Sequence, residues 1–389
     1  MTDITIASTS LKNREAGEDL ARQINVEMKT GAVDAVLVFA SPDNDYQSLL
    51  GALRDGSNAR LIVGCSSAGE FTSEMSGTGG TSAIAFRAPE MQFSASLATK
   101  LSVSREDAAA QLVNGFKGLK SAGYTYRTAI VLVDALAGHS DALVDQLTLA
   151  TGGMYQFVGG GAGDDARFAK THVFLGTEAH TDAAVALEIL SNKPIGIGAR
   201  HGWSPKGDPL RVTEAADACV VSLNVSPAVE AFEDHAVATD QKFDAGDPLP
   251  FFLHNIVGVK SDEGYKLRVP LGVSVDGGVN FAAEVPAGST AQIMTTGAES
   301  ASDAAAAAVR DAIDQVERGG NKPKAALFFD CVATRLRLGE DFQTELATVG
   351  RELKGANFAG FNSYGQIVRA EGQFNGFHNC TAVVCVFPD

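Results

Sequence analysis

The amino-acid sequence predicts an α/β protein with three related βαβαββ units and a β-rich module inserted before the third unit. Three near-continuous apolar runs suit strands that are buried on both faces of a helix-covered sheet. They read AVLVFAS at 35–41, TAIVLVDA at 128–135 and AALFFDC at 325–331. The same order of elements surrounds each run, which indicates an internal repeat.

Each unit is expected to open with a β-prone run, at 4–9, 93–102 and 291–297. The helix that follows carries one apolar stripe with a spacing of four residues, formed by Ala16, Leu20 and Ile24, by Ala108, Leu112 and Phe116, and by Ala305, Val309 and Ile313. After the apolar run, a shorter helix leads to a strand containing Gly64, Gly159 or Gly360. A last strand closes each unit, at 82–86, 183–187 and 381–387.

The spacing of these glycines locates the insertion. Gly159 follows Gly64 by 95 residues, whereas Gly360 follows Gly159 by 201. The extra stretch alternates apolar and polar residues and contains turn signals, as a β-rich module would. We therefore expect one domain of two repeat units at 1–190 and a second at 191–389, which joins the module (191–290) to the third unit (291–389).

Charge and composition exclude several classes of protein. The 389 residues carry a net charge of −16, which disfavours nucleic acid and anionic membranes as partners. The start of the chain does not resemble a signal peptide, and no apolar run is long enough to span a bilayer. Five cysteines, an odd number without a CxxC pair, fit a reduced, cytoplasmic protein.

Several motifs resemble the FIST proteins, bacterial sensory modules that have an N-terminal and a C-terminal FIST domain. Together they extend over almost the whole chain. Cys331 with Arg335 belongs to the pattern, and Gln366 departs from it, because the family has an acid at that position. The other motifs are VFASPD at 38–43, VGCSSAGE at 63–70, VGGGAGDD at 158–165, HGWSPKG at 201–207, GFNSYGQI at 360–367 and FHNCT at 377–381.

The resemblance implies a signal-input protein that binds a small molecule, with amino acids as suggested ligands, rather than an enzyme. Family members often carry a fused kinase, cyclase or chemotaxis output domain. Because the repeats and the module use all 389 residues, the signal is expected to pass to a separate protein of one of these types. A haem-binding subgroup that senses nitric oxide makes haem an alternative cofactor, and a cryptic small-molecule enzyme or a ligand-free scaffold are further alternatives.

Candidate ligand-binding residues lie mainly in the loops after the strands, because ligands of open α/β sheets bind at strand ends. Glu70, Asp164 and Asp165 are expected to hold a cationic group, and Arg335 a carboxylate through two parallel hydrogen bonds. The ligand pocket is expected between these loops and the β-rich module. Its other candidates are His201, Tyr364 and His378, and the loop glycines are Gly64, Gly69, Gly159 and Gly365.

Each candidate also has a purely structural explanation. The glycines allow tight turns, Arg335 could form a surface ion pair, and either histidine could be a hydrogen-bonded structural residue instead of an axial haem ligand. No Cys or His spacing supports a tetrahedral metal site. The segment with Gly64 and Gly69 lacks the Lys of a phosphate loop, and Ser66 and Ser67 lack a nucleophile elbow. Cys380 and Cys385 are expected to be packing residues.

Overall fold

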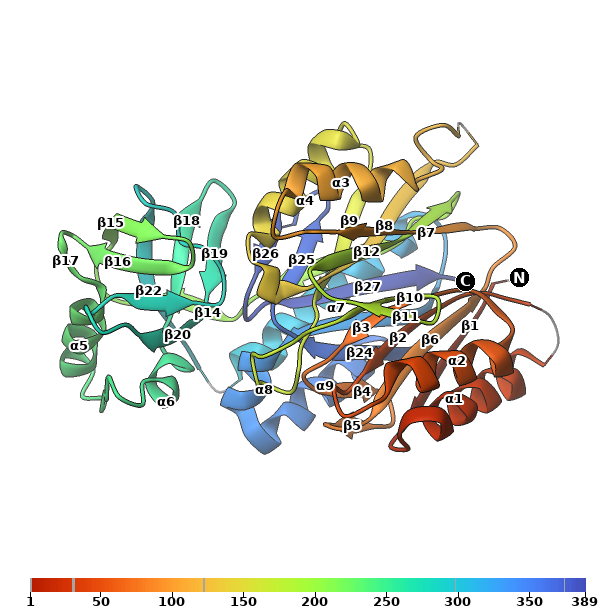
Figure 1. Cartoon of the computed structure of the whole chain (residues 1–389), viewed down its shortest axis with the longest axis horizontal. Helices are drawn as coiled ribbons and strands as arrows, with labels where there is room; N and C mark the ends of the chain where they lie inside the picture. Colours follow the sequence, from red (N-terminus) through yellow and green to blue (C-terminus); the bar gives the residue numbers. More distant parts are fainter. Residues whose placement is uncertain (1, 30–31, 122, 298, 374) are drawn as a thin grey trace.

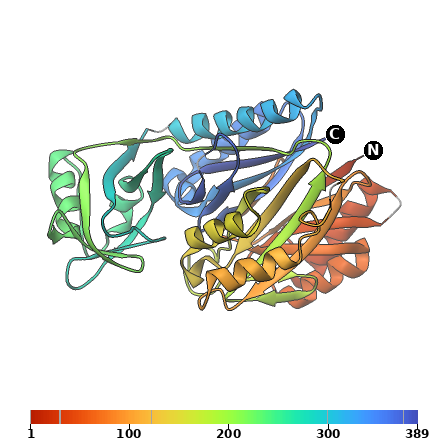
Figure 2. The same cartoon turned by 90° about the horizontal axis from the view of Figure 1, so that it is seen from above.

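The computed structural model describes residues 2–29, 32–121, 123–297, 299–373 and 375–389. A large α/β body contains three six-stranded sheets, and a smaller module at one end contains a nine-stranded sheet (Figures 1 and 2). The predicted α/β class is therefore confirmed. In the described part of the chain, no helix is long and apolar enough to cross a membrane.

Four strands of each body sheet follow one common order. The first strand is antiparallel to the last, the last is antiparallel to the second, and the second is parallel to the third. The sets are β1 (Asp3–Thr9), β6 (Thr81–Arg87), β2 (Val33–Ala40) and β3 (Ala59–Ser66); β7 (Gln92–Thr99), β12 (Ala183–Ser191), β8 (Tyr126–Val133) and β9 (Gln156–Gly161); and β13 (Gly196–Arg200), β27 (Ala382–Pro388), β23 (Pro323–Cys331) and β24 (Asn357–Ser363).

The remaining two strands of each body sheet come from another unit. The hairpin that follows β3 pairs with β24, the hairpin that follows β24 pairs with β9, and the hairpin after β9 pairs with β3. This cyclic exchange brings together the three loops that follow the glycine-containing strands. The hairpins are β4 (Glu70–Thr72) with β5 (Ser76–Gly77), β25 (Gln366–Arg369) with β26 (Gly376–His378), and β10 (Val173–Leu175) with β11 (Glu178–His180).

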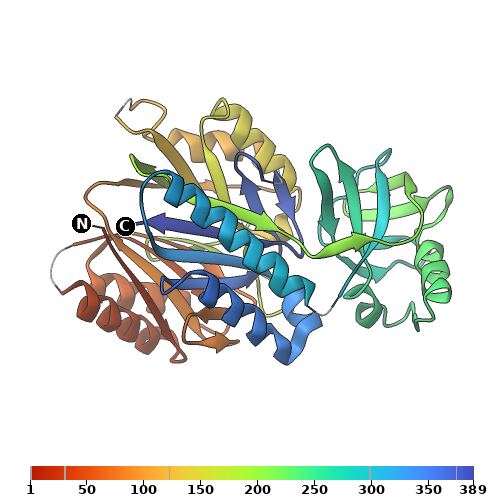
Figure 3. The same cartoon turned by 180° about the vertical axis from the view of Figure 1, so that it is seen from behind.

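The three sheets share one apolar core, and helices cover their outer faces. On β2, Leu37 and Phe39 join the shared core while Val38 packs beneath the helices, which explains why the run is apolar on both faces. The ring centroids of Phe39 and of Phe361 in the third sheet are 4.5 Å apart. The covering helices are α1 (Asn13–Met28) and α2 (Tyr46–Ser57), α3 (Arg105–Asn114) and α4 (Ser140–Ala150), and α7 (Ser300–Arg318) and α9 (Phe342–Glu352) (Figure 3).

Gly64, Gly159 and Gly360 occupy corresponding positions in the three units. Each is paired with the sixth residue of the neighbouring parallel strand: Val38, Val131 or Phe328. A Cβ atom on any of the three glycines would stand 1.9–2.0 Å from the carbonyl oxygen of that partner. Close approach of a neighbouring strand, rather than a turn, therefore requires glycine here.

The third unit does not begin where the sequence analysis places it. Residues 291–297 were expected to form its first strand, but β22 (Thr290–Thr296) pairs within the module, and β13 takes that place in the body sheet. The module is thus inserted after the first strand of the third unit. The run GIGAR of β13 is short and glycine-rich, so its sequence gives a weak strand signal.

The module consists of a curved sheet with two helices. Its apolar core contains Phe232 of α5 (Ala228–Ala238) and Phe252 of α6 (Leu249–Phe252). The sheet order is β19 (Gly264–Arg268), β18 (Ile256–Ser261), β22, β15 (Leu210–Ala216), β16 (Cys219–Leu223), β21 (Val279–Phe281) and β20 (Pro270–Val273), while β14 (Trp203–Pro205) pairs with β22 and β17 (Ser226–Pro227) with β16.

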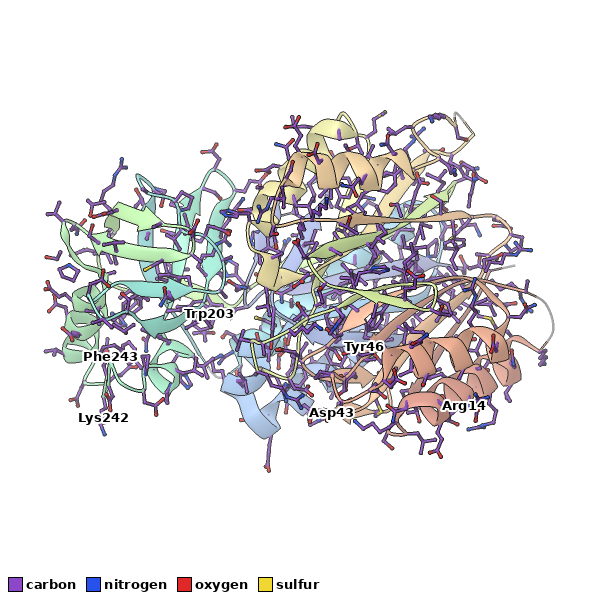
Figure 4. All side chains as sticks on the ribbon, in the orientation of Figure 1. Arg14, Asp43, Tyr46, Trp203, Lys242 and Phe243 are labelled. Atoms are coloured by element: carbon purple, nitrogen blue, oxygen red, sulfur yellow. The ribbon has the colours of Figure 1, made fainter. Side chains whose placement is uncertain are left out.

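A partly buried ion-pair cluster joins the module to the body. The guanidinium of Arg268 donates to the Asp141 carboxylate at the start of α4, at 3.0 Å, and the Lys266 ammonium donates to the same group at 2.9 Å. Arg268 also donates to the carbonyl oxygen of Phe377 in β26. Figure 4 shows Trp203 at the end of the module that lies next to the body.

Candidate functional site

Three loops meet in the body, which we call the central loops: 66–70, 161–165 and 362–366. Their backbones are hydrogen-bonded in a cycle. The N–H of Ala68 donates to the carbonyl oxygen of Asn362, that of Gly163 to Ser66, and that of Tyr364 to Gly161. Strand ends from three units thus supply side chains to one place.

Arg335 lies beside the central loops, on α8 (Val332–Leu338), which follows β23 directly. Burial lowers the pKa of its guanidinium, and Asp165, Glu70 and the Tyr364 hydroxyl act electrostatically on it. Within the described residues, Arg335 forms no ion pair, and its buried Nε has no hydrogen-bond partner. A half-buried cation therefore lies within electrostatic range of two carboxyl groups but forms no ion pair with them.

Glu70 is almost fully buried at the start of β4. Its carboxyl accepts hydrogen bonds from the Ser67 hydroxyl and, at 2.9 Å, from the N–H of Gly80. Burial raises the pKa of this carboxyl to about 8, and nearby Asp165 adds to the increase. Burial thus favours the neutral form of the Glu70 carboxyl.

Asp165 contributes the second carboxyl. Its Oδ2 accepts from the Ser41 hydroxyl at 3.3 Å, while its buried Oδ1 has no partner among the described groups. Burial also raises the pKa of this carboxyl. The residue has a φ of 55°, in the left-handed region of backbone conformations.

The carboxylate of Asp164 is already hydrogen-bonded to other groups of the protein. Its carboxylate accepts hydrogen bonds from the N–H groups of Phe168, Ala169 and Lys170 at 2.7–2.8 Å, and from the Tyr364 hydroxyl. Asp164 was predicted to hold a ligand cation. These contacts instead give it a structural role, because they order residues 164–170.

A small apolar cavity lies between the central loops and the module, where a pocket was expected. The rings of Tyr364 and Phe168, stacked with centroids 4.5 Å apart, form part of its wall. The open volume of this cavity is about 30 Å³. The other lining residues are Leu249, Leu253, Val269, Leu271, Ala282, Cys331, Val332, Ala333, Leu336 and Asn379.

His201 and His378 were expected at this pocket, but neither lines it. His378 is buried beside the charged cluster of Arg268 and Asp141, and burial lowers its pKa to about 3. His201 is partly buried, and its Nδ1 accepts from the N–H of Trp203 at 3.3 Å. A cavity this small, without a lining histidine, does not fit a haem with an axial histidine.

The loop glycines have distinct local roles. Gly69 has a φ of 129°, and a Cβ there would stand 2.7 Å from the Asn362 Oδ1 and 3.3 Å from the Arg335 Nε. Because Gly69 has no side chain, Arg335 can occupy this space. A Cβ on Gly365 would meet the Phe377 ring. Among the described residues, no group of three or more His, Cys, Asp or Glu side chains could hold a metal ion.

Comparison with protein families identifies the chain. The FIST N domain matches residues 34–226, and the FIST C domain matches residues 228–369. The protein belongs to the FIST family. FIST domains are sensory modules of signal transduction, which agrees with the resemblance found in the motifs. The two matches meet inside the β-rich module rather than at residue 190.

Other comparisons add little to the FIST assignment. No curated protein matches the sequence. The structures found include a cyanuric acid hydrolase from A. caulinodans (7% identity, 100% of this chain and 99% of that chain, TM-score 0.34). They also include PurLQS from Thermotoga maritima (11% identity, 100% and 72%, TM-score 0.22). Likeness at these TM-scores carries no argument about this FIST protein.

The structure brings together Glu70, Asp165, Arg335 and Tyr364 of the predicted residues, and it adds Phe168, which the sequence analysis missed. Asp164 and Asp165 were both candidates, because no local signal in the sequence separates the two aspartates. In the sequence, Phe168 is only an apolar residue after a glycine-rich loop, and nothing there indicates its ring contact with Tyr364.

Proposed function

We propose that this FIST protein is a signal-input protein that binds a small zwitterion of the α-amino acid class and passes the signal to a separate protein. The observation that carries the proposal is the arrangement of Arg335 opposite Glu70 and Asp165. The cation and the carboxyls are close enough to interact electrostatically, yet Arg335 forms no ion pair within the described residues.

A zwitterion would complete this arrangement. The planar guanidinium of Arg335 can bind a ligand carboxylate through two hydrogen bonds, and Glu70 with Asp165 can accept hydrogen bonds from a ligand ammonium group. The apolar cavity beside Tyr364 would take a hydrophobic side chain. Because its open volume is small, the ligand must displace α8 or the module, and that displacement is the proposed signal.

The test is a thermal-shift screen with the common amino acids, followed by calorimetry on any ligand found. Arg335→Ala is expected to weaken binding by about 1.5–3 kcal/mol, the scale of a hydrogen bond to a charged group. Arg335→Lys should restore part of this, because a point charge cannot make the paired contact. Arg14→Ala, which removes an exposed guanidinium on α1, is the matched control. Unchanged affinity in both Arg335 variants would contradict the proposal.

A further inference from the structure

Two buried cysteines lie close together, and one of them, Cys331, lines the apolar cavity. Cys331 is the last residue of β23, and Cys380 precedes β27; they are 2% and 5% exposed. Both belong to the apolar cluster that contains Trp203, and their thiols lie close enough to interact with one another. Cys380 was expected to be a packing residue, but this contact gives it a second role.

Four hydrogen-bonding groups lie around the sulfur of Cys331. They are the thiol and the N–H of Cys380, the N–H of Ala333 and the side-chain amide of Gln366. The Cys380 thiol makes the largest contribution, and against the effect of burial these donors lower the pKa of Cys331 to about 7. Donors of this kind favour the thiolate, which is the reactive form of cysteine.

The other buried cysteines lack this environment. Burial raises the pKa of Cys65, and it does the same for Cys385 on β27. Cys380 itself has a raised pKa, first because its thiol donates to Cys331. The pair therefore contains one sulfur with thiolate character and one neighbouring thiol.

The backbone of Cys380 is unusual as well. Its φ is 48°, in the left-handed region that residues other than glycine rarely adopt. Both the N–H and the thiol of this residue contact the Cys331 sulfur. Backbone conformations of this kind often occur at functional sites.

Small molecules can reach Cys331 from the cavity, because this residue is part of the cavity lining. An open volume of about 30 Å³ is enough for a molecule the size of water or slightly larger. Hydrogen peroxide has that size, whereas a bulkier thiol reagent would first have to open the cavity.

We propose that Cys331 is an oxidation site for hydrogen peroxide and small organic hydroperoxides, with Cys380 as its resolving thiol. The Cys331 thiolate attacks one peroxide oxygen, so that an S–O bond forms, the O–O bond breaks, and the other oxygen leaves as water or an alcohol after taking a proton. The Cys380 sulfur then attacks the sulfenic acid, an S–S bond forms, and water leaves. Two thiols and one hydroperoxide thus give one disulfide, one water and one further water or alcohol.

The experiment treats the reduced full-length protein with hydrogen peroxide, blocks the remaining thiols and maps the tryptic peptides. Cleavage after Lys324 and Arg335 isolates Cys331 in residues 325–335, while residues 370–389 contain both Cys380 and Cys385. The mapping therefore also uses Cys385→Ala, which makes the linkage unambiguous. We expect a Cys331–Cys380 disulfide to form at least about tenfold faster than any oxidation of Cys65 or Cys219.

Two variants separate the two steps. Cys380→Ser is expected to accumulate a sulfenic acid on Cys331 that dimedone traps, whereas Cys331→Ser should give neither the adduct nor the disulfide. Cys65→Ser is the matched control, since it removes a buried thiol without a thiol neighbour, and it should oxidise as the wild type does. The proposal fails if Cys331 stays reduced in the wild-type protein while the more exposed Cys219 oxidises, or if Cys331 pairs with another cysteine.

Discussion

The carboxyl groups of Asp330 on β23 and Glu345 on α9 lie at the same small cavity beneath α9. Both side chains are 1% exposed, and one oxygen of each has no hydrogen-bond partner among the described groups. Burial raises the pKa of both carboxyls, and the charge of Glu345 raises that of Asp330 further. In the other two units, the position of Asp330 is held by the apolar residues Ala40 and Val133.

Glu345→Gln is expected to stabilise the protein at alkaline pH. A native pKa above the unfolded value means that the folded chain keeps a proton which the unfolded chain loses, so wild-type stability falls as pH rises from about 4.5 to the native pKa. The variant should gain about 1–3 kcal/mol over the wild type near pH 8.5 and much less near pH 4.5.

Urea denaturation at both pH values measures this difference. Glu340→Gln is the control, because Glu340 is an exposed acid a few residues away. An equal gain at both pH values would mean that ionisation of Glu345 is not the cause.

Binding of a zwitterion at Arg335 should depend on pH through Glu70. The pKa of the free carboxyl is about 8, and an ammonium group beside it would favour the ionised form. Affinity should therefore rise between about pH 6 and pH 8, with proton release on binding. Calorimetry in buffers of different ionisation enthalpy detects the released protons. Glu70→Gln should lose both effects; if the pH dependence persists in this variant, another group is responsible.

Gly64→Ala is expected to destabilise the protein by more than about 3 kcal/mol or to prevent folding. Its Cβ would stand 2.0 Å from the carbonyl oxygen of Val38, so β2 and β3 would have to separate in a packed core. Gly51→Ala on α2 is the control, since a Cβ there meets nothing within 4 Å, and it should stabilise by about 0.5–1 kcal/mol. Denaturant melts of both variants decide the point, and equal stability would refute the close-approach explanation.

Asp141→Asn is expected to cost about 2–4 kcal/mol, because it leaves the buried guanidinium of Arg268 without its charge partner. Burial of Asp141 favours its neutral form, but Arg268 and Lys266 outweigh this and lower the pKa of the carboxyl. The stabilisation is therefore present above about pH 4 and is lost as pH falls through the lowered pKa. Denaturation near neutral pH and near pH 3 measures this contribution.

Asp145→Asn supplies the comparison, one turn further along α4. Asp145 is exposed and forms no ion pair in the described part of the chain. The two variants should differ clearly at neutral pH and converge in acid. Equal losses at neutral pH would show that Arg268 does not depend on Asp141.

Much of the fold follows from the sequence pattern. The runs at 35–41, 128–135 and 325–331 are mostly apolar on both faces because each strand lies between the shared core and a layer of helices. The helix stripes at Leu20, Leu112 and Val309 pack against the outer faces of the sheets. Local periodicity predicts these elements, because the spacing of apolar residues indicates whether one face or both faces are buried.

The pairing of strands does not follow from that pattern. Alternation shows which face of a strand is buried but not which strand lies beside it. Thus β22 could be read as the first strand of the third unit, although it belongs to the module. The exchange of hairpins among the three sheets is equally hidden, because each hairpin pairs with residues far away in the sequence.

By itself, the sequence determined the α/β class, the repeated elements and the membership of the FIST family, because all three depend on local spacing and on motifs. Only the tertiary structure decided that Arg335 faces Asp165 rather than Asp164, that His201 and His378 lie outside the cavity, and that Cys380 contacts Cys331. The direction of a side chain depends on single backbone angles, such as the positive φ of Asp165 and Cys380. Those angles are fixed by contacts between distant segments, which the order of residues does not reveal.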